Sequence, residues 1–460
     1  MWSWCGVRGV ASVAERDGGG SPRRAGCRRR RGGRRQVPRV EPPLGGAPGA
    51  HPATGAAASS SRIAREEEQA EARPSWSDLP ADLIGQVLVR LPSHADRVRL
   101  RAVCRSWRAD AKRQAAGLPP PLPWLALRDV GLLDLDGAPI RTALIQTEGT
   151  SSFLAVDNLA FLEQKDGGCC LVNPLSGSMA IPLPQLADAV LRARMKFKWD
   201  VYTKVILSSP PDSSMDPLIA ALISEHHYVV ISTCKHHDAI SVGYDSNVPL
   251  ADIAFLNGEL YALTMKEGLY VYSPNNGCLG APMNVSPGGF HQRITDAPKE
   301  RELYYFLPGL LYVVSRYLAV CDGRLFMVRR WLSVPAHTRL GDEERTSWFE
   351  VLEADLTIAP CQWRRLHRLG GHAIFLGSKC TKFVRASQCV GGVQEDCIYF
   401  MHRIYDNQAR EYWGLHADPL GDSGVYNMRT GAIKPLLPES RLAELPLKHQ
   451  FPTWFFPTDL

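Results

Sequence analysis

The chain has 460 residues, of which 45% are hydrophobic, so it can hold two or three domains with at least one sizeable core. Its formal net charge of +6 lies in residues 1–75, where 14 Arg outnumber 7 acidic residues, so residues 76–460 sum to −1. This nearly neutral part gives no reason to expect a nucleic-acid partner, and its longest apolar run is broken by Pro308, Gly309 and Arg316, so we expect no membrane span.

Residues 1–73 are rich in Gly, Ala, Pro, Ser and Arg, which predicts a disordered tail because such a segment cannot bury enough apolar surface. The basic run at residues 27–35 could be a nuclear localisation signal or a loose RNA-binding tract, although a leader without function is the favoured interpretation. A transit peptide is a further alternative. The 12 cysteines show no disulfide framework and follow no clean secretory signal, so we expect reduced thiols and a location in the nucleus, the cytoplasm or both.

A small helical module is predicted at residues 76–115. In its first helix Pro80 suits the first turn and Pro92 ends the helical pattern. Between them one continuous apolar stripe consists of Leu83, Ile84, Val87, Leu88 and Leu91.

A second helix is predicted to begin at Ser93, with Asp96 completing a capping box. Its apolar stripe consists of Leu100, Val103, Cys104 and Trp107, and its arginines lie mostly on the other faces. Because so short a module cannot form a large core, its stripes must pack on the rest of the chain or serve partly as a docking surface.

Residues 120–460 read as short strands separated by tight turns, with few helices. Polar turns beginning at Asn173, Ser273 and Asn427 are spaced by 100 and 154 residues, close to two and three multiples of a kelch-like period of about 50 residues. This spacing predicts a mainly β fold, a β-propeller of about seven blades, with the segments "GELYAL" and "GLYVY" as neighbouring antiparallel strands. A pair of β-sandwiches is the competing architecture.

The line "LPADLIGQVLVRLPSHADRVRLRAVCRSWR" resembles the F-box, a module of roughly 40 residues that binds the Skp-family adaptor of cullin–RING ubiquitin ligases. The resemblance covers about a tenth of the chain. It implies that the Leu79-Pro80 opening and the apolar residues of both stripes form the module's core and its adaptor contact. The adaptor-binding residues are therefore expected to be Leu79, Pro80, Leu83, Ile84, Val87, Leu88, Leu91, Val103, Cys104 and Trp107.

The C-terminal zone, including "LGGHAIFLGSKCTKFVRASQCVGGVQEDCIYFMHR" and the closing "PTWFFP", looks like plant F-box proteins that carry domain of unknown function 295. That resemblance implies a kelch-like propeller that holds a protein substrate, behind an F-box that reaches a cullin–RING ligase through its adaptor. It names no substrate.

One position departs from the F-box pattern, because Arg97 stands where many F-boxes carry Leu. A basic residue there could weaken adaptor binding. The alternative function is therefore a propeller scaffold whose degenerate F-box recruits no ligase. Nucleic-acid binding through the basic tail and the Arg-rich helix is a third, less favoured class.

Signals for chemistry are weak, so we expect no enzyme, catalytic residue, metal or cofactor. The cluster His226, His227, Cys234, His236 and His237 has zinc-ligand types, but adjacent strand residues point to opposite faces. Thiols on apolar strands are more often core residues than ligands, which applies to Cys169, Cys170, Cys389 and Cys397. Aromatic residues that could line a binding face, but are more often core, are Trp363, Trp413, Trp454 and Phe455.

Overall fold

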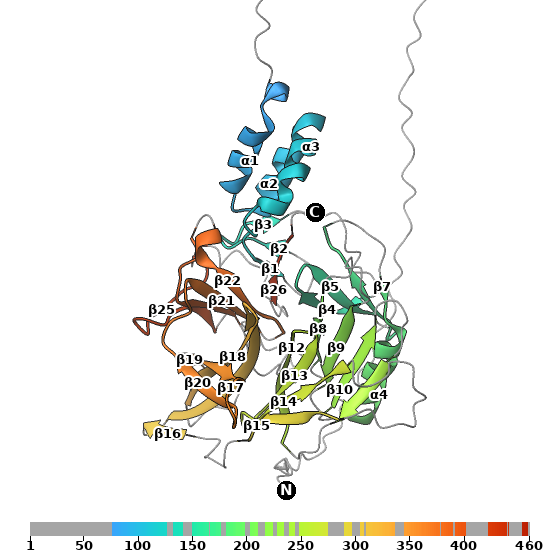
Figure 1. Cartoon of the computed structure of the whole chain (residues 1–460), viewed down its shortest axis with the longest axis vertical. Helices are drawn as coiled ribbons and strands as arrows, with labels where there is room; N and C mark the ends of the chain where they lie inside the picture. Colours follow the sequence, from blue (N-terminus) through green and yellow to red (C-terminus); the bar gives the residue numbers. More distant parts are fainter. Residues whose placement is uncertain are drawn as a thin grey trace, which may run out of the picture. The chain divides into compact units, whose positions relative to one another are not determined.

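The fold is seen in a computed structural model of the whole chain (Figure 1). It describes residues 76–126, 132–140, 150–164, 166–175, 181–197, 203–209, 217–223, 228–233, 239–243, 248–274, 289–296, 304–307, 310–335, 345–377, 379–389, 392–401, 422–438, 440 and 453–458. The predicted tail, Trp413 and the five residues of the histidine cluster, His226, His227, Cys234, His236 and His237, lie outside these residues. Among the described residues no helix is long and apolar enough to cross a membrane.

The helical module contains three α-helices flanked by two 3-10 turns. The α-helices are α1 (Ala81–Val89), α2 (His94–Ala102) and α3 (Arg105–Gln114), and the turns are η1 (Trp76–Asp78) and η2 (Ala115–Gly117). The prediction of one continuous second helix was therefore wrong, because Cys104 has an extended backbone (φ −155°, ψ 173°) that ends α2 and caps α3. The predicted capping box was also wrong: Ser93 makes no side-chain cap, and Asp96 pairs instead with Arg99 at 2.5 Å.

From residue 124 onward the described strands form six sheets, each built from consecutive strands apart from one C-terminal addition. Blade 1 is β26 (Thr453–Phe455), β1 (Trp124–Ala126), β2 (Leu132–Leu133) and β3 (Pro139–Ile140). Blade 2 is β4 (Thr150–Val156), β5 (Leu159–Gln164), β6 (Cys169–Val172) and β7 (Ile181–Pro182). Blade 3 is β8 (Thr203–Leu207), β9 (Leu218–Ile223), β10 (Tyr228–Thr233) and β11 (Ala239–Gly243).

Blade 4 again has four strands, whereas blades 5 and 6 have five, and in blade 6 β21 pairs in parallel with β23. Blade 4 is β12 (Leu250–Leu256), β13 (Glu259–Thr264), β14 (Leu269–Tyr272) and β15 (His291–Ile294). Blade 5 is β16 (Tyr304–Leu307), β17 (Leu310–Cys321), β18 (Arg324–Pro335), β19 (Arg345–Asp355) and β20 (Gln362–Leu366). Blade 6 is β22 (Thr381–Arg385), β21 (His372–Gly377), β23 (Cys397–Met401), β24 (Ser423–Asn427) and β25 (Ile433–Lys434), with the turn η5 (Ala386–Gln388) after β22.

These sheets form a closed ring. Strands of neighbouring sheets contact one another in the order β4, β8, β12, β17 and β22, which runs from blade 2 to blade 6. In blade 6, β21 contacts β26 of blade 1, and β26 contacts β4 of blade 2, so the ring is complete. The C-terminal strand β26 pairs with β1, so one sheet contains both ends of the propeller sequence. Figure 1 shows the sheets arranged around a common centre. This ring is a β-propeller, as predicted, and it excludes the alternative of two sandwiches.

The propeller has six blades in the described chain, so the prediction of about seven was wrong. The turns at Asn173 and Ser273 follow β6 and β14, which are two blades apart, as the 100-residue spacing predicted. The turn at Asn427 follows β24, which is also two blades further on, although 154 residues separate it from Ser273. That interval is lengthened by the 12-residue strands of blade 5, by a fifth strand in blades 5 and 6, and by the long connection from Met401 to Ser423, so two long blades were interpreted as three of regular length.

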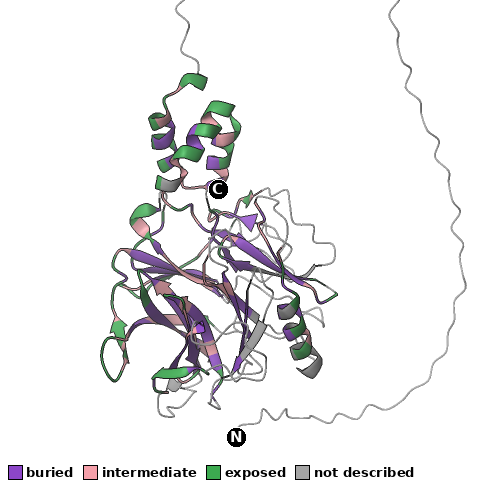
Figure 2. Cartoon of the chain, turned by 45° about the vertical axis from the view of Figure 1, so that its right-hand side comes forward, coloured by how far each residue is buried: buried purple, intermediate pink, exposed green. Residues whose placement is uncertain are grey.

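Each junction between neighbouring blades holds its own apolar core. Six clusters of buried side chains draw their members from the six successive pairs of sheets, the pair formed by blades 6 and 1 included. Figure 2 shows the strands as mostly buried and the helical module as largely exposed. A helix that the sequence analysis did not predict, α4 (Pro184–Phe197), places Leu186 and Ala189 in the cluster between blades 2 and 3.

Candidate protein-interaction site

The helical module has a very small core of its own. Ile84 and Leu88 of α1 pack with Leu100 of α2 and Ala111 of α3, and all four are buried. Half-buried side chains cover this group, namely Leu79, Leu91, Trp107 and Leu118. Because the core uses only one side of α1, the remaining apolar residues of that helix are left for another purpose.

Arg97 lies inside the module, not on its surface. Its side chain is fully buried; Nε donates to the Leu91 carbonyl and Nη1 to the Pro119 carbonyl, each at 2.8 Å. The guanidinium thus ties the loop after α1 to the Pro-rich linker that leads to the propeller. Arg97 therefore places no charge on the surface of the module, and its effect on adaptor binding stays a prediction.

The break between α2 and α3 is fixed by local hydrogen bonds. The Cys104 sulfur accepts from the Trp107 backbone N–H at 3.4 Å, which caps α3. The Trp107 indole Nε1 donates to the Trp76 carbonyl at 2.7 Å and anchors the start of the module. Cys104 and Trp107 are therefore half-buried positioning residues, whereas Val103 at the break is 60% exposed.

Exposed apolar side chains are concentrated in this module. Of the large hydrophobic residues that are exposed in the described chain, six lie within residues 76–103: Trp76, Leu83, Val87, Val89, Val98 and Val103. Leu83 and Val87 are one helical turn apart in α1, so they share a face. Uncovered apolar surface gathered in one small module is typical of a protein-binding site.

The predicted adaptor-binding residues therefore separate into two groups. Leu83, Val87, Val103 and Pro80 are exposed and available to a partner. The others are buried or half-buried and shape that surface from beneath: Ile84, Leu88, Leu79, Leu91, Cys104 and Trp107. Their contact with an adaptor stays a prediction.

In the propeller, the described aromatic and thiol candidates are mostly core, as their residue types suggested. Trp454 and Phe455 are fully buried in β26, and Cys169, Cys170, Cys389 and Cys397 are buried and form no disulfide. Trp363 is half-buried, and its Nε1 donates to the Glu267 carbonyl at 2.8 Å.

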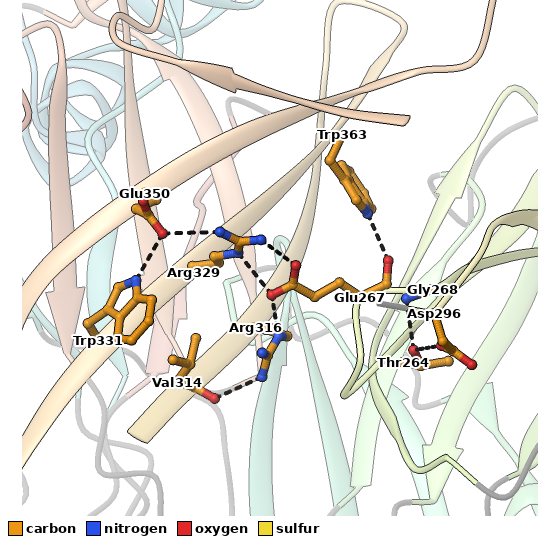
Figure 3. A network of polar contacts seen from close by, with 10 residues as sticks. All are labelled: Thr264, Glu267, Gly268, Asp296, Val314, Arg316, Arg329, Trp331, Glu350 and Trp363. Atoms are coloured by element: carbon orange, nitrogen blue, oxygen red, sulfur yellow. Dashed lines mark hydrogen bonds and ion pairs between the residues drawn. The ribbon is translucent and has the colours of Figure 1, made fainter. Parts of the chain in front are cut away.

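Glu267 is the centre of a polar network that joins blade 4 to blade 5 (Figure 3). It lies in the turn between β13 and β14 with a left-handed backbone (φ 68°). Its carboxylate accepts from Arg316 Nε at 2.8 Å and from both Nε and Nη2 of Arg329. Arg329 also reaches Glu350, whose Oε2 accepts from the Trp331 indole at 3.0 Å. Two guanidinium groups thus hold one nearly buried carboxylate across the junction.

This environment lowers the pKa of Glu267. Burial alone would raise that pKa, but the hydrogen bond from Arg329 and the charges of Arg316 and Arg329 together outweigh burial. A carboxyl whose folded-state pKa is depressed contributes stability above its unfolded-state pKa, and this contribution is lost as the pH falls through the folded-state value.

Glu267→Gln should therefore destabilise the protein at pH 7 but progressively less from about pH 5 downward, because protonation removes the same charge from the wild type. Urea unfolding of both proteins at a series of pH values measures the difference. Its matched control is Glu395→Gln, because Glu395 is exposed and pairs with the exposed Arg429. A Glu267→Gln difference that stays constant from neutral to acid pH would contradict this role.

A second link crosses the inner strands of blades 3, 4 and 5. Asp252 of β12 accepts from Lys204 Nζ of β8 at 2.5 Å and from the Leu318 N–H of β17 at 2.7 Å, and both charged side chains are buried. The sequence offered no signal for these junctions, because Asp252 is 48 residues from Lys204 and 66 from Leu318.

Two family models match the chain. The model described as F-box-like matches residues 76–114, which contain α1 to α3. The model described as KIB1-4 beta-propeller matches residues 138–427.

The solved structures that match this chain do so with low TM-scores and low sequence identity. YCF48 from Cyanidioschyzon merolae has 11% identity and a TM-score of 0.26, and the match covers 50% of this chain and 63% of that one. The N-terminal domain of Nup159 has 8% identity and a TM-score of 0.26, with 47% of each chain covered. A structure of Kap60 bound to yeast RCC1 (Prp20) has 9% identity and a TM-score of 0.22, and covers 53% of this chain and 68% of that one.

The chain spans about two thirds and half of the first two of these solved chains, respectively. No curated protein matches it significantly. Since the propeller model alone matches more than half of the chain, and the described strands of that region form propeller blades, the chain belongs to the KIB1-4 beta-propeller family and carries an F-box-like module in front of its propeller.

Proposed function

We propose that this protein is the substrate-receptor subunit of an SCF-type cullin–RING ubiquitin ligase. Its F-box-like module binds the Skp-family adaptor, and its propeller holds the target protein. The same proposal places the chain among plant F-box proteins with domain of unknown function 295 and a kelch-like propeller. It also includes a location in the nucleus, the cytoplasm or both.

One observation carries the proposal: Leu83 and Val87 of the first apolar stripe are exposed, while Ile84 and Leu88 of that stripe fill the module's core. Val103 of the second stripe is also exposed. A stripe that merely packed on the propeller would be covered within the chain. Burial of such side chains by a partner contributes about 1.5–3 kcal/mol for each one that is fully covered.

The mechanism assigned to the chain is tethering, without catalytic residues of its own. A target bound to the propeller is held beside the ubiquitin-loaded enzyme, so the transfer becomes effectively intramolecular. The buried networks at Glu267 and Asp252 link blades 3, 4 and 5 to one another, which supports a role as a scaffold that holds a target.

Adaptor binding tests the proposal directly. The full chain is co-purified with a Skp-family adaptor, and the affinity is measured for the wild type and Leu83→Asp. We expect Leu83→Asp to weaken binding at least about tenfold, since a charge in the centre of an apolar contact must be desolvated. The matched control is Gln86→Asp, which adds the same charge at an exposed polar position of α1.

Unfolding temperatures of both variants near that of the wild type would show that the change acts on the contact. Equal binding by the wild type and Leu83→Asp would contradict the assigned face. A wild type that fails to bind any Skp-family adaptor would contradict the ligase role and favour the scaffold with a degenerate F-box.

A further inference from the structure

Three side chains with metal-binding donor atoms meet where blade 5 joins blade 6. Cys321 is the last residue of β17, and Asp322 with Gly323 forms the two-residue turn to β18. Both turn residues have left-handed backbones (φ 48° and 70°), as the Asp-Gly pair of a type I′ hairpin requires. His372 is the first residue of β21 in the neighbouring blade. The two blades therefore place these residues together.

Their donor atoms are close and accessible from one side. One sulfur, one carboxylate oxygen and one ring nitrogen lie within 4.8 Å of one another, and no other such group of His, Cys, Asp and Glu occurs among the described residues. Cys321 and His372 are buried, whereas the Asp322 side chain is 53% exposed. A cation can thus enter past Asp322 and reach two donors fixed by the surrounding core.

The hydrogen bonds of His372 define its tautomer. Nδ1 lies 3.1 Å from the Leu369 carbonyl and 3.2 Å from the Gly370 carbonyl, and carbonyl oxygens only accept. Nδ1 therefore carries a proton, and in the neutral ring Nε2 presents its lone pair. A backbone carbonyl that orients the ring in this way is the usual outer partner of a metal-bound histidine.

The Nε2 atom of His372 lies 3.6 Å from the Oδ2 atom of Asp322. This separation exceeds a hydrogen bond, and two lone pairs in this arrangement repel unless a proton or a cation lies between them. Two ligands at about 2.0–2.1 Å from a tetrahedral zinc ion are about 3.4 Å apart, close to the observed separation.

We propose that Cys321, Asp322 and His372 bind a zinc ion that links blade 5 to blade 6. Sulfur, imidazole and carboxylate are the three donor types of protein zinc sites, and three protein ligands leave the fourth position to water or to an incoming group. The Cys321 proton is released on binding. This site is independent of the function proposed above.

Arg385 opposes the metal and so provides a sharp test. Its Nη2 lies 3.5 Å from the same Asp322 oxygen, and its side chain is 50% exposed. A fixed positive charge beside the site lowers the affinity for a cation. Arg385→Gln should therefore raise the metal affinity severalfold without disturbing the core, whereas removal of a ligand should lower that affinity.

Cobalt(II) titration of the metal-free full chain measures the site, since thiolate ligation gives cobalt a charge-transfer absorption. We expect Cys321→Ser to bind one fewer thiolate-ligated cobalt ion than the wild type. The control Cys361→Ser removes a half-buried thiol outside the group and should bind cobalt like the wild type. Asp322→Asn should bind at least about tenfold more weakly, because it loses a charged ligand. Asn tolerates the left-handed turn, so this variant should fold.

A second measurement uses zinc itself. Zinc bound only to the folded state should raise the unfolding temperature of the wild type and raise that of Asp322→Asn much less. The proposal is overturned if Cys321→Ser retains the full thiolate–cobalt absorption, or if Asp322→Asn, wild type and Arg385→Gln bind cobalt equally.

Discussion

Lys204→Met should lower the free energy of unfolding by about 3–5 kcal/mol, the effect of removing one partner from a buried ion pair. Met has nearly the volume of Lys, so the loss does not come from a cavity. It comes from Asp252, which remains buried with its charge uncompensated between blades 3, 4 and 5. Equilibrium unfolding in urea measures the difference from the wild type.

Lys382→Met is the matched control for this prediction. Lys382 also pairs with an aspartate, Asp157, at 2.7 Å, but the two side chains are 44% and 54% exposed. Exposed pairs contribute at most about 1 kcal/mol after solvent screening. Adding Asp252→Asn to Lys204→Met should restore part of the loss, since the amide removes the buried charge. Equal effects of Lys204→Met and Lys382→Met would contradict the role of the buried pair.

Local signals in the sequence predicted the propeller's repeating parts well. The segments "GELYAL" and "GLYVY" are the antiparallel neighbours β13 and β14, as expected. The turns from β4 to β5, from β12 to β13 and from β17 to β18 begin at Asp157, Asn257 and Asp322, all with left-handed backbones. Asp and Asn adopt that conformation more readily than other non-glycine residues, so such turns can be recognised locally.

The number of blades could not be derived in the same way, because it was inferred from the spacing between turns. That spacing also depends on the lengths of the strands and of the connections between them. The 12-residue strands β17 and β18 leave the turn residues unchanged but lengthen the interval between them. The helix α4 had a usable signal, since Leu186, Ala189 and Val190 recur at helical spacing after Pro184.

The candidate docking face was predictable in composition but not in orientation. Helical spacing gathered the apolar residues of α1 into one stripe, yet only the packed module shows that Leu83 and Val87 are exposed while Ile84 and Leu88 are buried. The burial of Arg97 could not be derived from the sequence either. The carbonyls of Leu91 and Pro119 accept hydrogen bonds from its guanidinium inside the module, and Pro119 is 22 residues away in the chain.

Ring closure gives the second large effect: Trp454→Ala should lower the free energy of unfolding by about 3–5 kcal/mol, as for other buried tryptophans. Trp454 is fully buried in β26, which pairs with β1 and so closes the first sheet with the last strand of the chain. Its ring meets Phe375 edge-on with centroids 4.9 Å apart, and its Nε1 donates to the Leu376 carbonyl at 3.0 Å. The substitution therefore leaves a cavity at the contact between blades 1 and 6 and removes the hydrogen bond to the Leu376 carbonyl.

Trp76→Ala is the control for the same change at an exposed site, because 77% of the Trp76 residue surface is accessible and only its backbone carbonyl is used by Trp107. Surface substitutions of this kind stay within about 0.5 kcal/mol of the wild type. Trp454→Phe should lie between the two, since it keeps much of the apolar volume but loses the hydrogen bond to Leu376. If Trp454→Ala proved no more destabilising than Trp76→Ala, the C-terminal strand would not be what closes the ring. Loss of stability in the expected order would instead identify one tryptophan, six residues from the C-terminal residue Leu460, as the side chain that joins the two ends of the propeller.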